Sequence, residues 1–262
     1  MNRLFTIFWN KYLSRLNKMQ CTKNIFAFTL AETLAVVGII GVIAALTLPN
    51  LNQSTGNKET VVKLQKLYSD LNNAYGQAIA VYGPIQKWPK GGDHSVVFSD
   101  RIRDFMKNTK YCPPANTTCY PGHQDNQTLP SFVTADGSAF LIWADFTCSS
   151  SSGNGAEEFA PIGDLVCGTI PVDIDGPGKG PNTKGIDRFE FSITKKHGIL
   201  PRGGQSDVYT QGDKIKSCFN GRWAGCTGWV IENGNMDYLK ADSNGKCKDS
   251  GVTLSWTNTS CK

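Results

Sequence analysis

Histidine is scarce in this sequence of 262 residues, which contains only His94, His123 and His197, all far apart. The sequence also lacks a Cys-x-x-Cys pair, a Gly-x-Ser-x-Gly or His-Glu-x-x-His motif, and a phosphate-binding loop. It therefore shows no pattern typical of a serine hydrolase, a zinc protease or a nucleotide-binding enzyme. We expect a protein that is not an enzyme, in which each isolated histidine lies on the surface or packs against its neighbours.

Acidic residues are absent from the first 27 positions, which carry Arg3, Lys11, Arg15, Lys18 and Lys23. The whole chain has 27 basic and 22 acidic residues, a formal charge of +5, so removing these five basic residues leaves 22 against 22. The remainder has no excess of basic residues that would favour nucleic acid, and we expect no nucleic-acid partner.

Cysteine is frequent, because the chain has nine, and eight of them follow Cys21 as an even set. An even set without zinc-site spacing is typical of disulfides formed in an oxidising compartment, and zinc is the rival interpretation. The sequence does not distinguish among the many possible pairings, although pairs of sequence neighbours are the simplest expectation. The disulfide candidates are Cys112, Cys119, Cys148, Cys167, Cys218, Cys226, Cys247 and Cys261.

One long apolar run extends from Phe28 to Leu48, and its only charged residue is Glu32. At about 1.5 Å of rise per residue, a helix over this run would extend about 30 Å, the thickness of the hydrocarbon core of a bilayer. We expect a single transmembrane helix with a cytoplasmic N-terminus, because the basic residues precede it. A cleaved secretory signal is an alternative, although the run is longer than such signals require and has no clear Ala-x-Ala site.

Glu32 needs an explanation, since a carboxylate near the centre of a membrane helix costs about 2.5 kcal/mol or more. One explanation is that Glu32 lies close enough to the helix start to reach the interface by itself. The other is a partner of opposite charge. A plain membrane anchor would explain the length of the run but would give Glu32 no purpose.

The stretch AFTLAETLAVVGIIGVIAALTLPNL (27–51) resembles the N-terminal segment of type IV prepilins and of type II secretion pseudopilins. In that family a prepilin peptidase cuts before a phenylalanine and methylates it, so the resemblance implies cleavage between Ala27 and Phe28. The leader is then residues 1–27, or begins at Met19, and Ala27 stands where the family prefers glycine. Glu32 becomes the fifth mature residue, which in this family pairs with the amino terminus of a neighbouring subunit during assembly.

The resemblance also implies a helix kink at Gly41 and Pro49, where many pilins carry glycine and proline. The fold class that it implies is α+β: a pilin-like fold whose long N-terminal helix packs on an antiparallel β-sheet head with disulfide-pinned loops. That helix would comprise a transmembrane half, 28–48, and an amphipathic half, 49–83, followed by an extracytoplasmic head, 84–262.

The function implied is that of a structural subunit, a minor pilin or pseudopilin of a type IV pilus or a type II secretion pseudopilus. Its partners would be a prepilin peptidase, other subunits in a helical filament and an inner-membrane assembly platform. The chain would reside in the bacterial inner membrane and then in a periplasmic or cell-surface filament. The alternative is a membrane-anchored extracytoplasmic binding module or hydrolase that uses residues 28–48 only as an anchor.

Downstream, apolar residues at spacings of three and four predict an amphipathic helix over 57–82, which Gly83-Pro84 ends. Alternating patterns around Asp136-Gly137 (131–146) and Asn233-Gly234 (228–239) predict two hairpins, and 188–194 and 252–257 predict further strands.

The stretch VDIDGPGKGPNTKGID (172–187) is similar to the aspartate-rich and glycine-rich calcium loop of major pseudopilins. The resemblance implies a calcium site at Asp173, Asp175 and Asp187, since calcium takes about six to eight oxygen ligands. Aspartates beside glycines also commonly stabilise turns through bonds from the side chain to the backbone, and this alternative stays open.

Overall fold

The computed structural model describes residues 30–123, 127–148, 158–159, 162–205, 218–219 and 226–262. The first element is the helix α2, Leu30–Tyr82. Contacts between residues divide the chain into two units, Met1–Asn52 and Gln53–Lys262, so the boundary falls inside α2. The part of α2 from Gln53 onward belongs with the remainder of the chain.

The predicted transmembrane helix is wrong, because no helix among the described residues is long and apolar enough to cross a membrane. In the N-terminal part of α2 the large apolar side chains that the structure describes lie between Leu34 and Ile43. This finding overturns three predictions: the fold class with a transmembrane half, the single-pass location in the inner membrane, and the membrane anchor of the alternative function.

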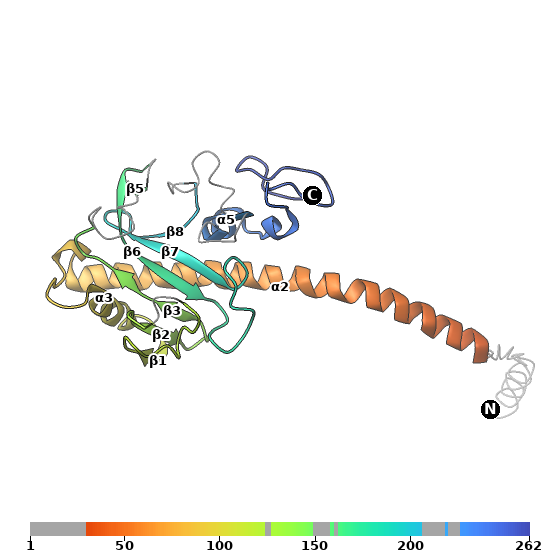
Figure 1. Cartoon of the computed structure of the whole chain (residues 1–262), viewed down its shortest axis with the longest axis horizontal. Coiled ribbons are helices and arrows are strands. Elements are labelled where there is room, and N and C mark those ends of the chain that lie inside the picture. The colour runs from red at the N-terminus through yellow and green to blue at the C-terminus, as the bar shows by residue number, and fades with distance from the viewer. Residues whose placement is uncertain (1–29, 124–126, 149–157, 160–161, 206–217, 220–225) are drawn as a thin grey trace, which may run out of the picture. The chain divides into compact units, whose positions relative to one another are not determined.

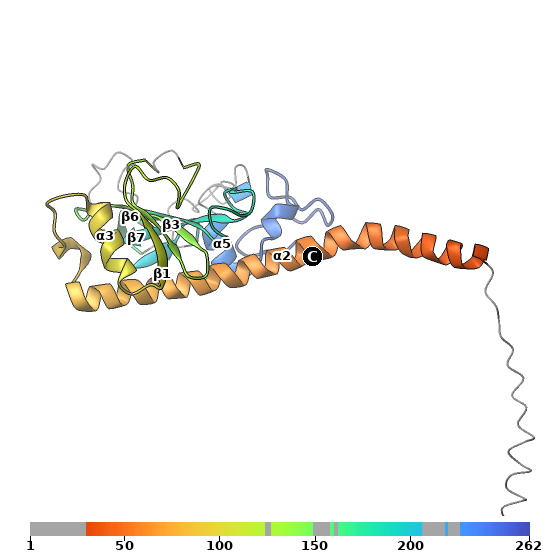
Figure 2. The same cartoon turned by 90° about the horizontal axis from the view of Figure 1, so that it is seen from below.

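The amphipathic stripe predicted over 57–82 is confirmed. Its members Leu64, Leu71 and Ala78 are fully buried, and Tyr68 stacks on Phe191 of the sheet with ring centroids 5.4 Å apart. In Figure 1 the sheet overlaps this part of α2, and the view turned by 90° in Figure 2 shows the strands on one side of it. Burial of each large apolar side chain contributes about 1.5–3 kcal/mol, so this stripe is a major part of the core.

Gly83 and Pro84 end α2 as the sequence predicts. Gly83 has a positive φ of 76°, and its N–H donates to the carbonyl of Ile79 over 2.9 Å. The indole N–H of Trp88 donates to the carbonyl of Gly83 over 2.7 Å. This left-handed glycine is a common helix C-terminus, and Pro84 follows because it cannot continue the helix.

Two short helical elements follow α2, namely η1 (Ile85–Lys87) and α3 (His94–Arg103). Asp93 caps α3, since its carboxylate accepts the backbone N–H groups of Ser95 and Val96. Phe98 of α3 packs near Trp88, with ring centroids 5.7 Å apart. The aromatic contact fixes α3 against the end of α2.

The sheet is antiparallel throughout, in the order β1-β2-β3-β6-β7-β8, and β4 and β5 also pair with β6. The central strand β6 therefore contacts four others. The strands are β1 (Asn108–Cys112), β2 (Ser131–Thr134), β3 (Ala139–Leu141), β4 (Trp143–Ala144), β5 (Glu158–Phe159), β6 (Asp164–Asp173), β7 (Arg188–Thr194) and β8 (Ile199–Pro201).

The hairpin predicted around Asp136-Gly137 is confirmed by β2 and β3, and the strand predicted at 188–194 is β7. The hairpin predicted over 228–239 is wrong. That segment contains the end of the helix α5 (Cys226–Asn233) and the short helix η4 (Asp237–Lys240). Gly234, at φ 62°, ends α5, and its N–H donates to the carbonyl of Val230.

The strand predicted at 252–257 is also wrong in detail. Thr253 and Ser255 take part in isolated bridges, to Lys246 and Asn258 respectively, and no continuous strand forms within this described segment. The bridges fold the segment back on itself near Cys247 and Cys261. A disulfide between these two cysteines closes it.

The predicted disulfides are confirmed. Cys112 pairs with Cys119 and Cys218 with Cys226, which are the sequence neighbours that the spacing favours. The other two bonds are Cys148–Cys167 and Cys247–Cys261. Each bond contributes typically about 2–4 kcal/mol by restricting the unfolded chain.

Candidate functional site

The N-terminal part of α2 presents an apolar surface to solvent. Seven large apolar side chains between residues 34 and 43 have exposed fractions from 53% to 66%. An α-helix turns by about 100° per residue, so these positions lie on every side of the helix rather than on one stripe. We call them the apolar segment: Leu34, Val36, Val37, Ile39, Ile40, Val42 and Ile43.

The predicted processing residues adjoin this segment. Ala27 and Phe28 lie outside the described residues, and so does the leader 1–27. Glu32 lies in α2, although the structure describes only its backbone. α2 runs through both Gly41 and Pro49, and the kink at these positions stays a prediction.

The three aspartates predicted to bind calcium lie in and beside one connection, residues 174–187, which we call the β6–β7 loop. Asp173, the last residue of β6, is fully buried. Its Oδ1 accepts the N–H of Gly176 over 2.9 Å, and its Oδ2 accepts Nε of Arg188 over 3.0 Å. The loop thus starts at a buried carboxylate with two protein donors.

Asp187 ends the loop and is also buried. Its carboxylate accepts the backbone N–H groups of Asn182 and Thr183. Gly180, at φ 65°, leaves room for two carboxylates, since a Cβ there would overlap Asp187 and lie 2.6 Å from Oδ2 of Asp175. Asp175 Oδ1 is buried and has no hydrogen-bond partner among the residues that the structure describes.

Burial and the adjacent carboxyl of Asp175 raise the pKa of Asp173 to about 6, although Arg188 opposes the change. The structure confirms the turn chemistry for Asp173 and Asp187, whose carboxylates accept backbone N–H groups. Within the described part of the chain, no three or more histidine, cysteine, aspartate or glutamate side chains form a group that could hold a metal ion.

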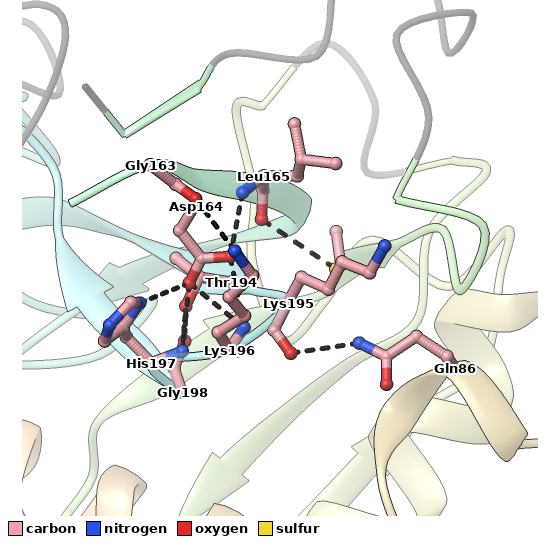
Figure 3. Close-up of polar contacts among 10 residues, drawn as sticks. Gln86, Gly163, Asp164, Leu165, Thr194, Lys195, Lys196, His197 and Gly198 are labelled. Atoms are coloured by element: carbon pink, nitrogen blue, oxygen red, sulfur yellow. Dashed lines mark hydrogen bonds and ion pairs between the residues drawn. The ribbon is translucent and has the colours of Figure 1, made fainter.

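A carboxylate–imidazole pair lies at another edge of the sheet, and the sequence pattern does not indicate it. Asp164, the first residue of β6, is fully buried, and Nδ1 of His197 lies 2.7 Å from its Oδ2 (Figure 3). The carboxylate also accepts the backbone N–H groups of Leu165, Lys196 and His197. The pair connects the turn between β7 and β8 to the start of β6.

Burial tends to raise the pKa of Asp164, but the hydrogen bonds from His197, Lys196 and Leu165 outweigh burial and hold that pKa below its ordinary value. Gln86 reinforces the same turn, because its Nε2 donates to the carbonyl of Lys195 over 3.0 Å. These contacts serve the fold.

The two other histidines are consistent with packing roles. His94 stacks on Phe146 with ring centroids 4.6 Å apart, and its Nδ1 accepts the N–H of Phe146. His123 meets the ring of Tyr120 edge to face. The histidines therefore remain separate in space as they are in the sequence.

Comparison of the chain with protein-family models, with curated proteins and with solved structures gave no match. The functional argument therefore rests on the residues and contacts described above. Among them, the apolar segment of α2 is the clearest indication of function, because a large contiguous apolar patch on a protein surface marks an interaction site.

Proposed function

We propose that this chain is a structural subunit, a pilin or pseudopilin, which assembles with other subunits into a helical filament. A prepilin peptidase would first cut before Phe28 and methylate it. The observation that carries the proposal is the apolar segment, whose seven large side chains are all more than half exposed. Both a type IV pilus and a type II secretion pseudopilus would accommodate such a subunit.

The distribution of these side chains around the helix supports a filament over a simple dimer. One neighbour would cover one face, whereas a helix that is apolar on all sides needs neighbours on all sides. A bundle of apolar segments from several copies would provide them. Removing each of these side chains from water would contribute roughly 1 kcal/mol, so the association would gain several kcal/mol per subunit.

The resemblance at the N-terminus implies a contact that would align neighbouring subunits along the filament axis. Cleavage would expose a cationic amino group on Phe28, four positions before Glu32. By analogy with the family, that amine would meet Glu32 of a neighbouring subunit. A carboxylate among apolar side chains then gains a counter-ion only in the correct axial register.

The processing step predicts a mature N-terminus of N-methylphenylalanine at Phe28. Mass spectrometry of the protein from cells that contain its peptidase would measure this terminus directly. An intact leader would contradict the proposal. A terminus beyond Pro49 would instead indicate an ordinary secretory signal.

The assembly step predicts that Ile40→Lys reduces the yield of sheared filaments by more than about tenfold. Ile40 is 59% exposed in the single subunit, and filament assembly would surround it with apolar side chains. Burying an unpaired ammonium there costs several kcal/mol, and about 1.4 kcal/mol corresponds to a factor of ten.

Val81→Lys is the matched control, because Val81 is a β-branched residue of the same helix with 63% exposure, outside the apolar segment. We expect Val81→Lys to assemble normally. Circular dichroism and the intact disulfides of both variants would show that each is folded. Equal filament yields for the two variants would contradict a role of the apolar segment in assembly.

A further inference from the structure

Arg188, the first residue of β7, directly follows the β6–β7 loop and bonds to Asp173, which precedes the loop, and to Asn182 within it. The residue is 8% exposed. Its Nε donates to Asp173 over 3.0 Å, while its Nη2 donates to the carbonyl of Pro121 over 2.7 Å and to Oδ1 of Asn182 over 3.0 Å. Its guanidinium carbon lies 4.6 Å from the ring centroid of Tyr120.

These acceptors are of the kind that calcium takes in proteins, namely a carboxylate, a backbone carbonyl and a side-chain amide oxygen. In this chain the guanidinium has all three. The carboxylate of Asp187 is also engaged, because it accepts two backbone N–H groups. Two of the three aspartates that the resemblance assigns to calcium therefore already have protein donors, and the residues do not fit a calcium site.

We propose that Arg188 takes the place of a divalent cation, as the built-in counter-ion that closes the β6–β7 loop without calcium. A guanidinium suits this role, because it is permanently charged and presents five N–H donors in a rigid fork. One end of the fork holds Asp173, and the other holds Asn182 within the loop and Pro121 outside it. The side chain thus joins both ends of the connection to a third segment.

The charges of the site support this assignment. Asp173 and Asp187, at the two ends of the connection, are both buried, and Asp173 has the Arg188 guanidinium as its charged partner over 3.0 Å. Removing Arg188 would leave the buried carboxylate of Asp173 without its charged partner, and the carbonyl of Pro121 and Oδ1 of Asn182 without this donor. Such a loss is strongly destabilising when the partner stays buried.

Trypsin provides a local test, because Lys179 and Lys184 are exposed residues of the loop. Cleavage after these lysines would be followed by mass spectrometry on the full chain, with disulfides intact, in chelator or in millimolar calcium chloride. We expect the wild type to be cleaved slowly and at the same rate in both buffers. We expect Arg188→Gln to be cleaved more than about tenfold faster in chelator, since its loop has lost the central donor.

Arg202→Gln is the matched control. Arg202 is 11% exposed at its side chain and forms an ion pair with Glu190 over 2.6 Å, away from the β6–β7 loop. We expect its cleavage after Lys179 and Lys184 to match that of the wild type.

A wild-type loop that calcium protects by more than about threefold would overturn the proposal, and this comparison needs no variant. Unchanged cleavage of folded Arg188→Gln would overturn it as well. If Arg188→Gln does not fold, Arg188→Lys replaces it, because lysine keeps the charge but lacks the fork. Faster cleavage of Arg188→Lys in chelator would then support the proposal, and wild-type-like cleavage would overturn it.

Discussion

Replacing Asp164 with alanine is expected to lower the free energy of unfolding by about 3–5 kcal/mol. The carboxylate is fully buried and accepts the backbone N–H groups of Leu165, Lys196 and His197. Alanine would leave the N–H groups of Leu165 and Lys196 without this acceptor, whereas the N–H of His197 keeps Oγ1 of Thr194, and each unsatisfied donor costs about 1–3 kcal/mol. Denaturation by urea, followed by circular dichroism, would measure the change.

The variant His197→Gln separates the contribution of the His197 ring from that of the backbone N–H groups that bond to Asp164. The His197 side chain is 46% exposed, so we expect a loss below about 1 kcal/mol when only the ring contact is removed. A loss below 1 kcal/mol for Asp164→Ala as well would contradict the proposed role of the carboxylate as a backbone acceptor.

The pH dependence of the free energy of unfolding gives a second measurement of the contribution of Asp164. Because the folded-state pKa of Asp164 lies below its unfolded value, the resulting stability is present above about pH 4 and is lost as the pH falls through the folded pKa. Asp164→Asn carries no titrating group at this position. We expect it to lose less stability than the wild type on acidification over that range.

Gly228→Ala and Gly76→Ala are expected to change stability in opposite directions, although both glycines lie in helices. Gly228 of α5 donates its N–H to the carbonyl of Arg202 over 2.7 Å. A Cβ on Gly228 would overlap backbone atoms of Gly203 and Gly204, which cannot rotate away as a side chain can. We expect a loss of about 3 kcal/mol, at the upper end of overpacking.

Gly76 of α2 has open space around its Cβ direction, with no atom within 4 Å. Alanine there restricts the unfolded chain and suits the helix better, so we expect a gain of about 0.5–1 kcal/mol. Urea denaturation of both variants would measure the difference. Changes of the same sign would contradict the close approach of α5 to the backbone at Gly203 and Gly204.

Local patterns predicted those elements whose partners are close in sequence or whose period is unambiguous. The stripe along 57–82 and the hairpin at Asp136-Gly137 are examples. Asn233-Gly234 misled the prediction because a left-handed glycine can either turn a hairpin or end a helix. The buried contacts of Trp229 and Val230, at positions three and four after Cys226, decide for a helix.

The candidate sites show the same limit. The resemblance to a calcium loop grouped Asp173, Asp175 and Asp187, but it did not reveal Arg188, whose acceptors come from three separate segments. Similarly, Asp164 and His197 are 33 residues apart, and only the pairing of β6 with β7 brings them together. Hydropathy alone likewise predicted a membrane-spanning helix, whereas no helix among the described residues is long and apolar enough to cross a membrane.

The four disulfides have one consequence for how the chain matures. In each, a cysteine is joined to the next cysteine along the chain, at separations of 7, 19, 8 and 14 residues. Among the eight cysteines that follow Cys21, oxidation in the order in which they emerge would thus present each cysteine with its native partner first. Short loops also close at the lowest entropic cost, so the correct set of bonds can form without reshuffling.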